Sequence, residues 1–265
     1  MKIALNIIKI AAIVYFFLCI LLYFIQERLI FFPDKIAADY TFQFSQNFEE
    51  LYFKTTDNKK LSGVLFKAGN SKGLIFYLHG NAGSLQSWGQ IAKAYTDLHY
   101  DLFLLDYRGY GKSEGSIVNE NQFYEDVQLA YNTLKTKYSE KQIIVLGYSI
   151  GTGAATKLAS INKPRLLILQ APYFSLTDLV KHNFNIVPSF LLKYKFETNK
   201  FLSACKMPVV IFHGNKDEVI YYGSSLKLKE LFKTTDTLIT LNGEGHNGMS
   251  GNPAYLIELQ KILSK

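Results

Sequence analysis

Residues 143–155 read IIVLGYSIGTGAA, and this stretch decides the fold class. The apolar run Ile143–Leu146 predicts a strand buried on both faces, as in a parallel sheet, and the small residues from Thr152 onward predict a helix start. Between them, residues 147–151 match the pattern G-x-S-x-G, which holds a serine at a sharp strand-to-helix turn. Glycine is needed on both sides because side chains there would collide with neighbouring strands. The stretch therefore predicts Ser149 as a catalytic nucleophile.

Outward from this turn, short apolar runs alternate with longer amphipathic stretches, which predicts one α/β domain with a mostly parallel sheet. The predicted strands are Leu51–Thr55, Gly63–Lys67, Leu74–Leu78, Leu102–Asp106, Ile143–Leu146, Leu166–Leu169, Val209–Phe212 and Thr237–Leu241. The predicted helices are Gln86–Leu98, Glu120–Tyr138, Gly153–Ser160, Ser224–Phe232 and Pro253–Leu263.

Two later strand ends carry the partners that a serine nucleophile requires. Asp217 follows the strand Val209–Phe212, and His246 lies in the glycine-rich loop after Thr237–Leu241. The order serine, aspartate, histidine is the one expected when successive strand ends supply a catalytic triad. His246 would take the serine proton, and Asp217 would orient the imidazole and stabilise its cation. Glu218 is the alternative acid, one residue further on.

An oxyanion hole needs two backbone N–H groups, one after the nucleophile and one from the loop after an early strand. Ile150 is the candidate for the first, and Asn81, in the sequence LHGNAG of residues 78–83, is the candidate for the second. His79 in the same loop comes too early in the chain to be the base, so we interpret it as bracing the loop.

The segment from about 173 to 206 is too long for a simple connection, so we expect it to form a cap over Ser149. Its apolar residues include Phe184, Phe190 and Leu191, which we predict contact the substrate. Lysines outnumber acids in its second half. An ordinary amphipathic cap and a cap that touches anionic headgroups and admits an acyl chain both fit this pattern.

The N-terminus predicts a membrane anchor. Residues 10–25 are uncharged and almost wholly apolar, and extending the run back to Ile3 gives a helix able to cross a hydrocarbon core of ~30 Å. A cleaved signal peptide or a buried helix are the alternatives, but bulky residues follow the run where a signal peptidase needs small ones. We predict an anchor over residues 1–28 and a catalytic domain over 35–265. Lys2 and Lys9 favour a cytoplasmic N-terminus with the domain extracytoplasmic, periplasmic in a bacterium.

Composition excludes several other classes. The chain has 265 residues and a formal charge of +7, but its basic residues are spread out, so we expect no nucleic-acid partner. Residues 111–113 end like a phosphate loop, yet Asp106 stands where its first glycine belongs, so we expect no nucleotide. Cys19 and Cys205 cannot form a disulfide framework, and no two histidines are four residues apart, so we expect no metal site.

With these motifs, the stretch LDYRGYGKSEG of residues 105–115 makes the chain resemble the α/β-hydrolase superfamily. Within it, the chain is similar to the membrane-anchored branch that includes the α/β-hydrolase domain-containing proteins thirteen and seventeen. The shared pattern also covers ERLIFFP at 27–33, HGNAG at 79–83, APYFSL at 171–176 and DEVI at 217–220. One departure is Ile220-Tyr221, where the branch usually has a proline after its acid loop.

The resemblance implies an eight-stranded sheet with helices on both faces, a short helical cap and serine hydrolase activity without a cofactor. Members of the branch and its neighbours cleave acyl thioesters, lysolipids or peptides. We therefore expect hydrolysis of a carboxylic ester, thioester or lysolipid through an acyl-enzyme, with the lipid bilayer as a partner. A catalytically silent binding protein of the same fold and a serine peptidase of the aminopeptidase-like group are the alternatives.

Overall fold

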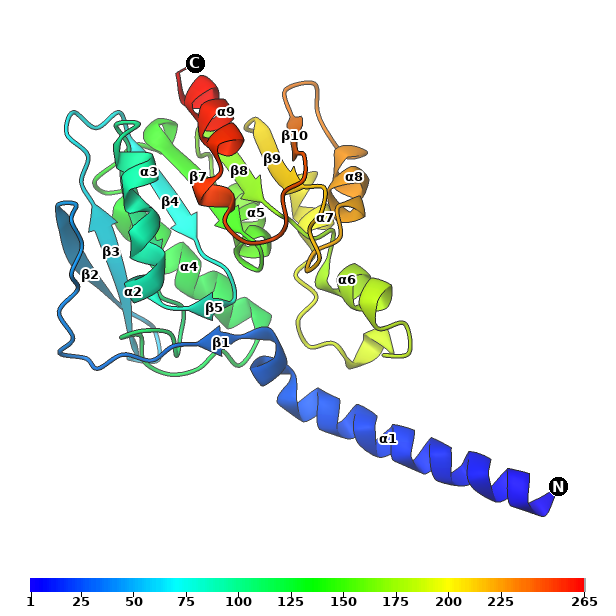
Figure 1. The fold of residues 1–265 in the computed structure, drawn as a ribbon. Helices are drawn as coiled ribbons and strands as arrows, with labels where there is room; N and C mark the ends of the chain where they lie inside the picture. Colours follow the sequence, from blue (N-terminus) through cyan, green and yellow to red (C-terminus); the bar gives the residue numbers. More distant parts are fainter. Residues whose placement is uncertain (265) are drawn as a thin grey trace.

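A computed structural model describes residues 1–264 and contains an eight-stranded sheet with helices on both faces (Figure 1). Its strands are β2 (Phe48–Lys54), β3 (Lys60–Phe66), β4 (Leu74–Leu78), β6 (Asp101–Leu105), β7 (Ile143–Tyr148), β8 (Leu166–Gln170), β9 (Val209–Gly214) and β10 (Thr237–Leu241). The α-helices are α1 (Lys2–Ile30), α2 (Leu85–Trp88), α3 (Ala92–Thr96), α4 (Glu120–Leu134), α5 (Gly151–Ile161), α6 (Leu176–Asn183), α7 (Thr198–Leu202), α8 (Gly223–Lys229) and α9 (Pro253–Leu263).

The sheet order is β10-β9-β8-β7-β4-β6-β3-β2. Neighbouring strands from β10 to β6 pair in parallel, whereas β3 pairs antiparallel with both β6 and β2. The predicted mostly parallel sheet of eight strands is therefore confirmed. The chain winds from β4 toward one edge and from β7 toward the other, so the loops after these strands diverge and leave a crevice at their carboxyl ends.

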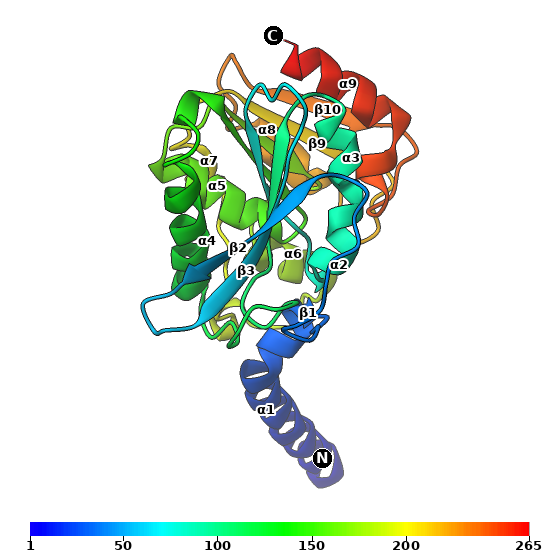
Figure 2. The same ribbon diagram turned by 90° about the vertical axis from the view of Figure 1, so that its left-hand side faces the viewer.

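Two apolar cores lie on the two faces of the sheet, one under α4 and α5 and the other under α3 and α9 (Figure 2). Neighbouring residues on a strand point to opposite faces, so Phe76 belongs to the first core and Tyr77 to the second. The rings of Phe76 and Tyr131 of α4 are 5.5 Å apart, and those of Tyr77 and Tyr95 of α3 are 5.8 Å apart. Burial on both faces explains why the central strands read as continuous apolar runs.

The largest departure from the predicted helices is at 86–98. The chain there forms α2, the 3₁₀ helix η1 (Gly89–Ile91) and α3 rather than one helix. Phe44 packs directly on Gly89, where a Cβ would lie 2.3 Å from its ring. The helical pattern was correctly placed, but this close approach interrupts the regular helix.

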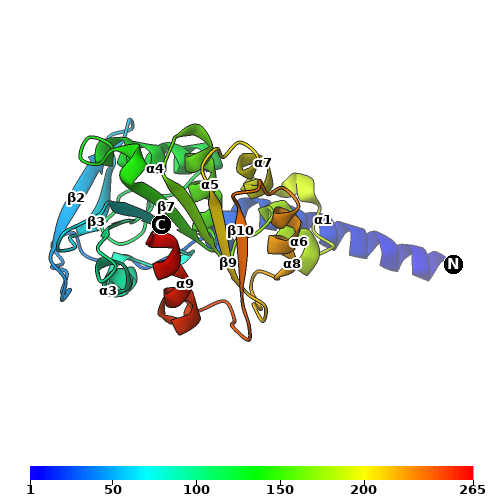
Figure 3. The ribbon, with the colours of Figure 1, turned by 90° about the horizontal axis from the view of Figure 1, so that it is seen from above.

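Helix α1 runs away from the sheet with its N-terminus far from the domain (Figures 1 and 3). It is long and apolar enough to cross a membrane, and its apolar window is exposed in this structure. Its C-terminal turn docks on the domain: Phe31 is buried, and β1 (Phe32–Pro33) pairs in parallel with β5 (Ala82–Gly83). The helix thus extends past the predicted anchor boundary at residue 28.

The segment 173–206 contains α6, the 3₁₀ helix η3 (Ser189–Leu191) and α7. It lies on the side of the domain from which α1 emerges, and η3 contacts α1 (Figure 1). Tyr194 and Phe196 join the core under α4 and α5, and their rings pack near Phe31. Tyr173, at the start of the segment, belongs to the same core, so residues from both ends of the segment are fixed in the domain.

Candidate active site

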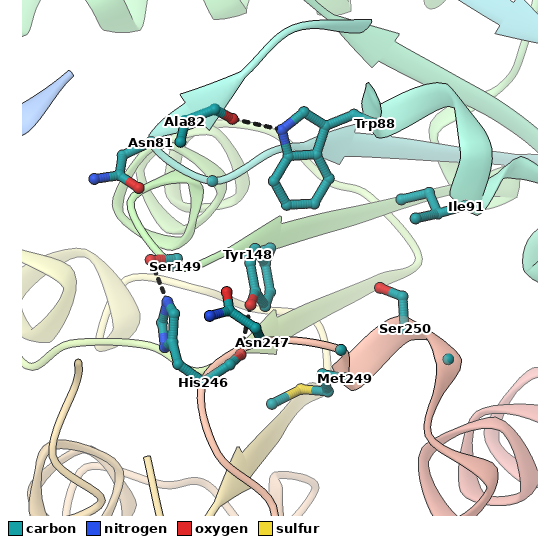
Figure 4. A pocket seen from close by; sticks show the side chains of 13 residues that line it. Asn81, Ala82, Trp88, Ile91, Tyr148, Ser149, His246, Asn247, Met249 and Ser250 are labelled. Atoms are coloured by element: carbon teal, nitrogen blue, oxygen red, sulfur yellow. Dashed lines mark hydrogen bonds between the residues drawn. The ribbon is translucent and has the colours of Figure 1, made fainter. Parts of the chain in front are cut away.

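Ser149 stands at the turn between β7 and α5 with a backbone φ of 53°. This left-handed conformation is uncommon for a residue with a side chain and costs on the order of 1–3 kcal/mol, so it persists only where the surroundings hold it. The side chain of Ser149 projects into a pocket at the carboxyl edge of the sheet (Figure 4). This is the sharp turn that the G-x-S-x-G pattern predicts.

The two flanking glycines are required by close packing. A Cβ on Gly151 would lie 2.2 Å from the carbonyl oxygen of Leu78, and one on Gly147 would lie 2.6 Å from that of Gly151. Contacts this short do not occur between real atoms, so a larger residue would force β4, β7 and α5 apart. The glycines let α5 start directly against the neighbouring strand.

Asp217 and His246 meet Ser149 although they lie far from it in sequence. The distance from Ser149 Oγ to His246 Nε2 is 3.0 Å, and His246 Nδ1 lies 2.7 Å from Asp217 Oδ2. An ionised carboxylate can only accept, so Nδ1 carries the proton and Nε2 accepts from the serine hydroxyl. Asp217, rather than Glu218, is the acid on His246. This geometry allows the proton of the Ser149 hydroxyl to pass to His246 Nε2, while Asp217 holds the imidazole in place.

The carboxylate of Asp217 has further partners. The backbone N–H groups of Val219 and Ile220 donate to its Oδ1, and His213 Nε2 lies 3.2 Å from its Oδ2. Burial would raise the pKa of Asp217, but the hydrogen bonds from His213 and His246 outweigh it and hold the pKa well below its usual range. Asp217 is thus a fixed negative charge beneath the imidazole.

Two other residues that position His246 and its acid were not singled out from the sequence. The hydroxyl of Tyr148, the x before the serine, donates to the carbonyl oxygen of His246 at 2.5 Å and ties the histidine loop to the serine turn. His213 is fully buried at the end of β9, where its Nδ1 accepts from the hydroxyl of Ser225 at 2.6 Å. A histidine at a strand end facing an acid loop is the signal that could have identified it.

Asn81 lines the pocket in front of Ser149 (Figure 4), and Ile150 directly follows Ser149 in the chain. Within residues 1–264, neither backbone N–H donates a hydrogen bond. The carbonyl of Asn81 accepts from Phe32 N–H at 2.8 Å and from the Tyr110 hydroxyl at 2.7 Å, which fixes the loop from behind. The Asn81 side chain donates to Ile30 at the end of α1. The loop that carries Asn81 is therefore held by the end of the apolar helix.

His79 makes contacts that suit a bracing role. Its Nδ1 lies 2.7 Å from the Gly80 carbonyl, and its own carbonyl accepts from the Tyr107 hydroxyl at 2.8 Å. Burial lowers the pKa of His79 to about 4 and raises the pKa of Asp106, which lies beside it, to about 8. Both groups are therefore neutral near pH 7.

The pocket in front of Ser149 has a volume of about 330 Å³. Its apolar wall includes Trp88, Ile91 and Met249, and Trp88 Nε1 donates to the Ala82 carbonyl at 2.8 Å (Figure 4). The complete lining is Gly80, Asn81, Ala82, Trp88, Ile91, Tyr148, Ser149, His246, Asn247, Gly248, Met249, Ser250 and Gly251.

The predicted substrate-contacting residues of the cap lie elsewhere. Phe184, Phe190 and Leu191 are not among the residues that line this pocket, and the aromatic rings of the first two are exposed. The physical reason is that α1 holds this part of the segment: Gln26 Nε2 donates to the Leu191 carbonyl at 2.7 Å. The pocket wall comes instead from α2, η1 and the loop after β10. In this structure none of the three predicted cap residues therefore faces the pocket in front of Ser149.

Comparisons with known proteins agree with this architecture. The family model described as serine aminopeptidase, S33, matches residues 69–201. Alpha/beta hydrolase domain-containing protein 17C of Mus musculus is 30% identical over 226 residues, covering 81% of this chain and 68% of that protein. Alpha/beta hydrolase domain-containing protein 17B of Homo sapiens is 31% identical over 202 residues, covering 74% and 68%.

Solved structures share the fold. An esterase of Pyrococcus furiosus superposes with a TM-score of 0.67 at 20% identity, covering 88% of this chain and 95% of that one. Acetyl xylan esterase 1 of Thermoanaerobacterium sp. also gives a TM-score of 0.67, at 16% identity, covering 85% and 86%. The family match over half of the chain, together with the identity to the two relatives above, shows that the chain belongs to the serine aminopeptidase S33 family of α/β hydrolases.

Proposed function

We propose that this hydrolase uses Ser149 as its nucleophile, His246 as its general base and acid, and Asp217 to orient and charge-balance the imidazole. The observation that carries the proposal is the pair of hydrogen bonds joining the three side chains at 3.0 Å and 2.7 Å. The left-handed backbone of Ser149 supports it, because strain of this kind concentrates at catalytic turns.

The reaction balances as an acyl transfer. Ser149 Oγ attacks the acyl carbon while its proton passes to His246 Nε2, and the leaving alcohol or thiol takes that proton as its bond to carbon breaks. Water then attacks the acyl-enzyme, giving its proton to the same nitrogen, and the carboxylic acid leaves. The N–H groups of Asn81 and Ile150 would stabilise the oxyanion in both steps. Removing one such donor typically lowers kcat by a factor of about 10²–10³.

The pocket lining favours an uncharged acyl group. Trp88, Ile91 and Met249 supply apolar surface, and an ester, thioester or lysolipid would place its acyl chain against them. A peptidase that selects a free N-terminus needs an acidic group near the scissile bond to hold the ammonium. None of the residues that line this pocket in the described chain is acidic. We therefore favour an acyl ester or thioester over an N-terminal peptide.

We further propose that α1 is an uncleaved, single-pass anchor with its N-terminus in the cytoplasm and the hydrolase domain outside it. Lys2 and Lys9 precede the apolar run, which is the arrangement that the positive-inside rule favours. Retention of the helix is supported by its docked end, since cleavage just after α1 would disrupt the packing of Phe31 and the pairing of β1 with β5.

The test is chemical labelling of the nucleophile. We expect Ser149→Ala to abolish both fluorophosphonate labelling and p-nitrophenyl butyrate hydrolysis, because losing the nucleophile of a triad can cost about 10⁶ in kcat. Ser160→Ala, at the far end of α5, serves as the matched control and should keep both. Labelling that persists in the Ser149 variant would show that another residue is the nucleophile. Absence of labelling in the wild type would favour a silent binding protein.

A further inference from the structure

The most exposed apolar side chains outside α1 lie together in the segment 182–192, which we call the cap tip. Phe184, Ile186 and Phe190 are 62%, 73% and 82% exposed, more than any other large apolar side chain in residues 31–264. The cap tip contains no Asp, Glu, Lys or Arg, and Lys181 and Lys193 flank it. A short apolar segment bounded by lysines has the composition of a membrane-surface element.

The cap tip lies against α1. Tyr15 of the helix donates to the Ile186 carbonyl at 2.7 Å, and Gln26 both donates to the Leu191 carbonyl at 2.7 Å and accepts from the Lys193 N–H at 2.9 Å. Tyr15 and Gln26 are separated by about 16 Å along a helix. The cap tip therefore follows the C-terminal part of the apolar helix rather than the sheet.

These contacts also provide hydrogen-bond partners for polar side chains of α1. Tyr15 lies within the apolar run of α1 and Gln26 directly follows it, and in a bilayer the polar group of each would need a partner. The carbonyl groups of the cap tip supply those partners. Near the C-terminal end of α1, Lys193 Nζ lies 3.1 Å from Glu27 and 4.8 Å from the centre of the Tyr23 ring. Charged and aromatic groups thus meet at the level where the helix leaves its apolar stretch, as at a membrane–water interface.

The backbone of the cap tip limits how deeply it can enter lipid. Turns within it satisfy the N–H groups of Val187, Leu191 and Leu192. The N–H groups of Asn185, Ile186, Ser189 and Phe190 have no hydrogen-bond partner within residues 1–264. Unsatisfied N–H groups are not tolerated in hydrocarbon but can bind water or headgroups, so the segment suits the boundary between headgroups and acyl chains.

We propose that the cap tip is a second membrane-contacting element, which rests on the proposed anchoring by α1. Its occupant is the bilayer leaflet through which α1 leaves the membrane, with Phe190, beside the Gln26 end of the apolar run, inserted at the headgroup–acyl boundary and Lys193 in the headgroup layer. The Asn81 loop, held by the end of α1, would then be positioned close to that leaflet. Two attachments restrict rotation of the domain, so the pocket would keep a fixed orientation toward the membrane surface.

The experiment is fluorescence quenching by brominated lipids in vesicles that carry the full chain. Trp88 is the one tryptophan of the sequence, so each reporter is placed in a Trp88→Phe background. Phe190→Trp should show blue-shifted emission and lose more of it to lipids brominated near the headgroup than to lipids brominated near the chain end. Phe17→Trp marks α1 and should be quenched by deep bromines. Ile257→Trp on α9, at the opposite end of the domain, is equally a surface apolar site and should be quenched by neither.

The outcomes separate the two proposals. If Phe17→Trp is quenched and Phe190→Trp behaves like Ile257→Trp, α1 is a membrane helix but the cap tip does not touch lipid, and the inference is overturned. If Phe17→Trp also escapes quenching, the proposed anchor itself fails. Ile186→Trp provides a second reporter, so that a folding defect of one variant does not decide the result. Quenching of Phe190→Trp mainly by deep bromines would contradict the proposed depth.

Discussion

At the scale of single residues, the glycines around Ser149 determine whether the serine turn can form. We expect Gly151→Ala to lower the free energy of unfolding by about 1–3 kcal/mol or more, because its methyl group would overlap the Leu78 carbonyl. Gly69→Ala is the matched control, since nothing lies within 4 Å of a Cβ there. Urea unfolding followed by circular dichroism measures both. Equal midpoints for the two variants would contradict the tight turn.

The choice of Asp217 over Glu218 can be tested directly. Asp217→Asn keeps the size of the side chain but favours the wrong tautomer of His246, so we expect kcat for p-nitrophenyl butyrate to fall by about 10⁴. Glu218→Gln, one residue further on, should change it little. The reverse ranking would mean that the acid loop shifts by one residue when substrate binds.

The buried pair of Asp106 and His79 gives stability a pH dependence of defined sign. Asp106 has its pKa raised to about 8, so the folded chain binds more protons than the unfolded one and stability falls as pH rises. His79, with its pKa lowered to about 4, gives the opposite slope below its unfolded pKa of about 6.5, and the two offset each other there.

Between pH 6.5 and 8 only the Asp106 contribution remains. We expect the wild type to lose up to about 2 kcal/mol of stability across this window, and Asp106→Asn to flatten the decline. Thermal unfolding at several pH values measures it, with the exposed Asp97→Asn as the control that keeps the wild-type slope. An unchanged slope in Asp106→Asn would show that another group titrates.

At the residue scale, the sequence singles out candidates where the chemistry leaves a local pattern, and the structure brings those side chains together. Ser149, Asp217 and His246 each follow a recognisable strand, and the sheet brings the ends of parallel strands together. Tyr148 and His213 were missed because their roles depend on contacts with the His246 loop and the Asp217 carboxylate, which no local pattern records.

At the scale of elements, long apolar runs were predicted well and short or tertiary features were not. The run at Thr237–Leu241 and the helix Pro253–Leu263 have the bounds that the sequence predicts. Strands β1 and β5 are two residues each and carry no periodic signal. The docking of the α1 end and of the cap tip depends on single polar residues such as Gln26, whose partner lies 165 positions away.

The docked end of α1 predicts a cost for removing too much of it. A chain that starts at Lys35 loses the buried Phe31, worth about 1.5–3 kcal/mol, and the contacts of Ile30 and Phe32 with Asn81. We expect it to unfold at a lower temperature and to hydrolyse p-nitrophenyl butyrate more slowly than a chain that starts at Gln26. Equal rates and melting temperatures would show that the junction serves only as a tether.

At the scale of the whole molecule, the position of the pocket relative to the cap tip determines which residues select the acyl chain. The cap tip contacts α1, whereas the apolar wall before Ser149 comes from Trp88, Ile91 and Met249. Acyl selection and membrane contact are therefore assigned to different surfaces. The two surfaces can be changed independently, because they share no residue.

Chain-length profiles in detergent solution test this division. Each methylene that enters an apolar pocket contributes about 0.8 kcal/mol, so kcat/KM should rise about fifteenfold for every two carbons from acetate until the pocket of about 330 Å³ is filled. Met249→Ser should flatten that rise, because it replaces apolar wall with a hydroxyl. Phe190→Ser should keep the wild-type slope. If instead Phe190→Ser flattens the profile and Met249→Ser does not, the cap closes over Ser149 during catalysis, and the sequence-based expectation for Phe184, Phe190 and Leu191 would hold for the substrate-bound enzyme.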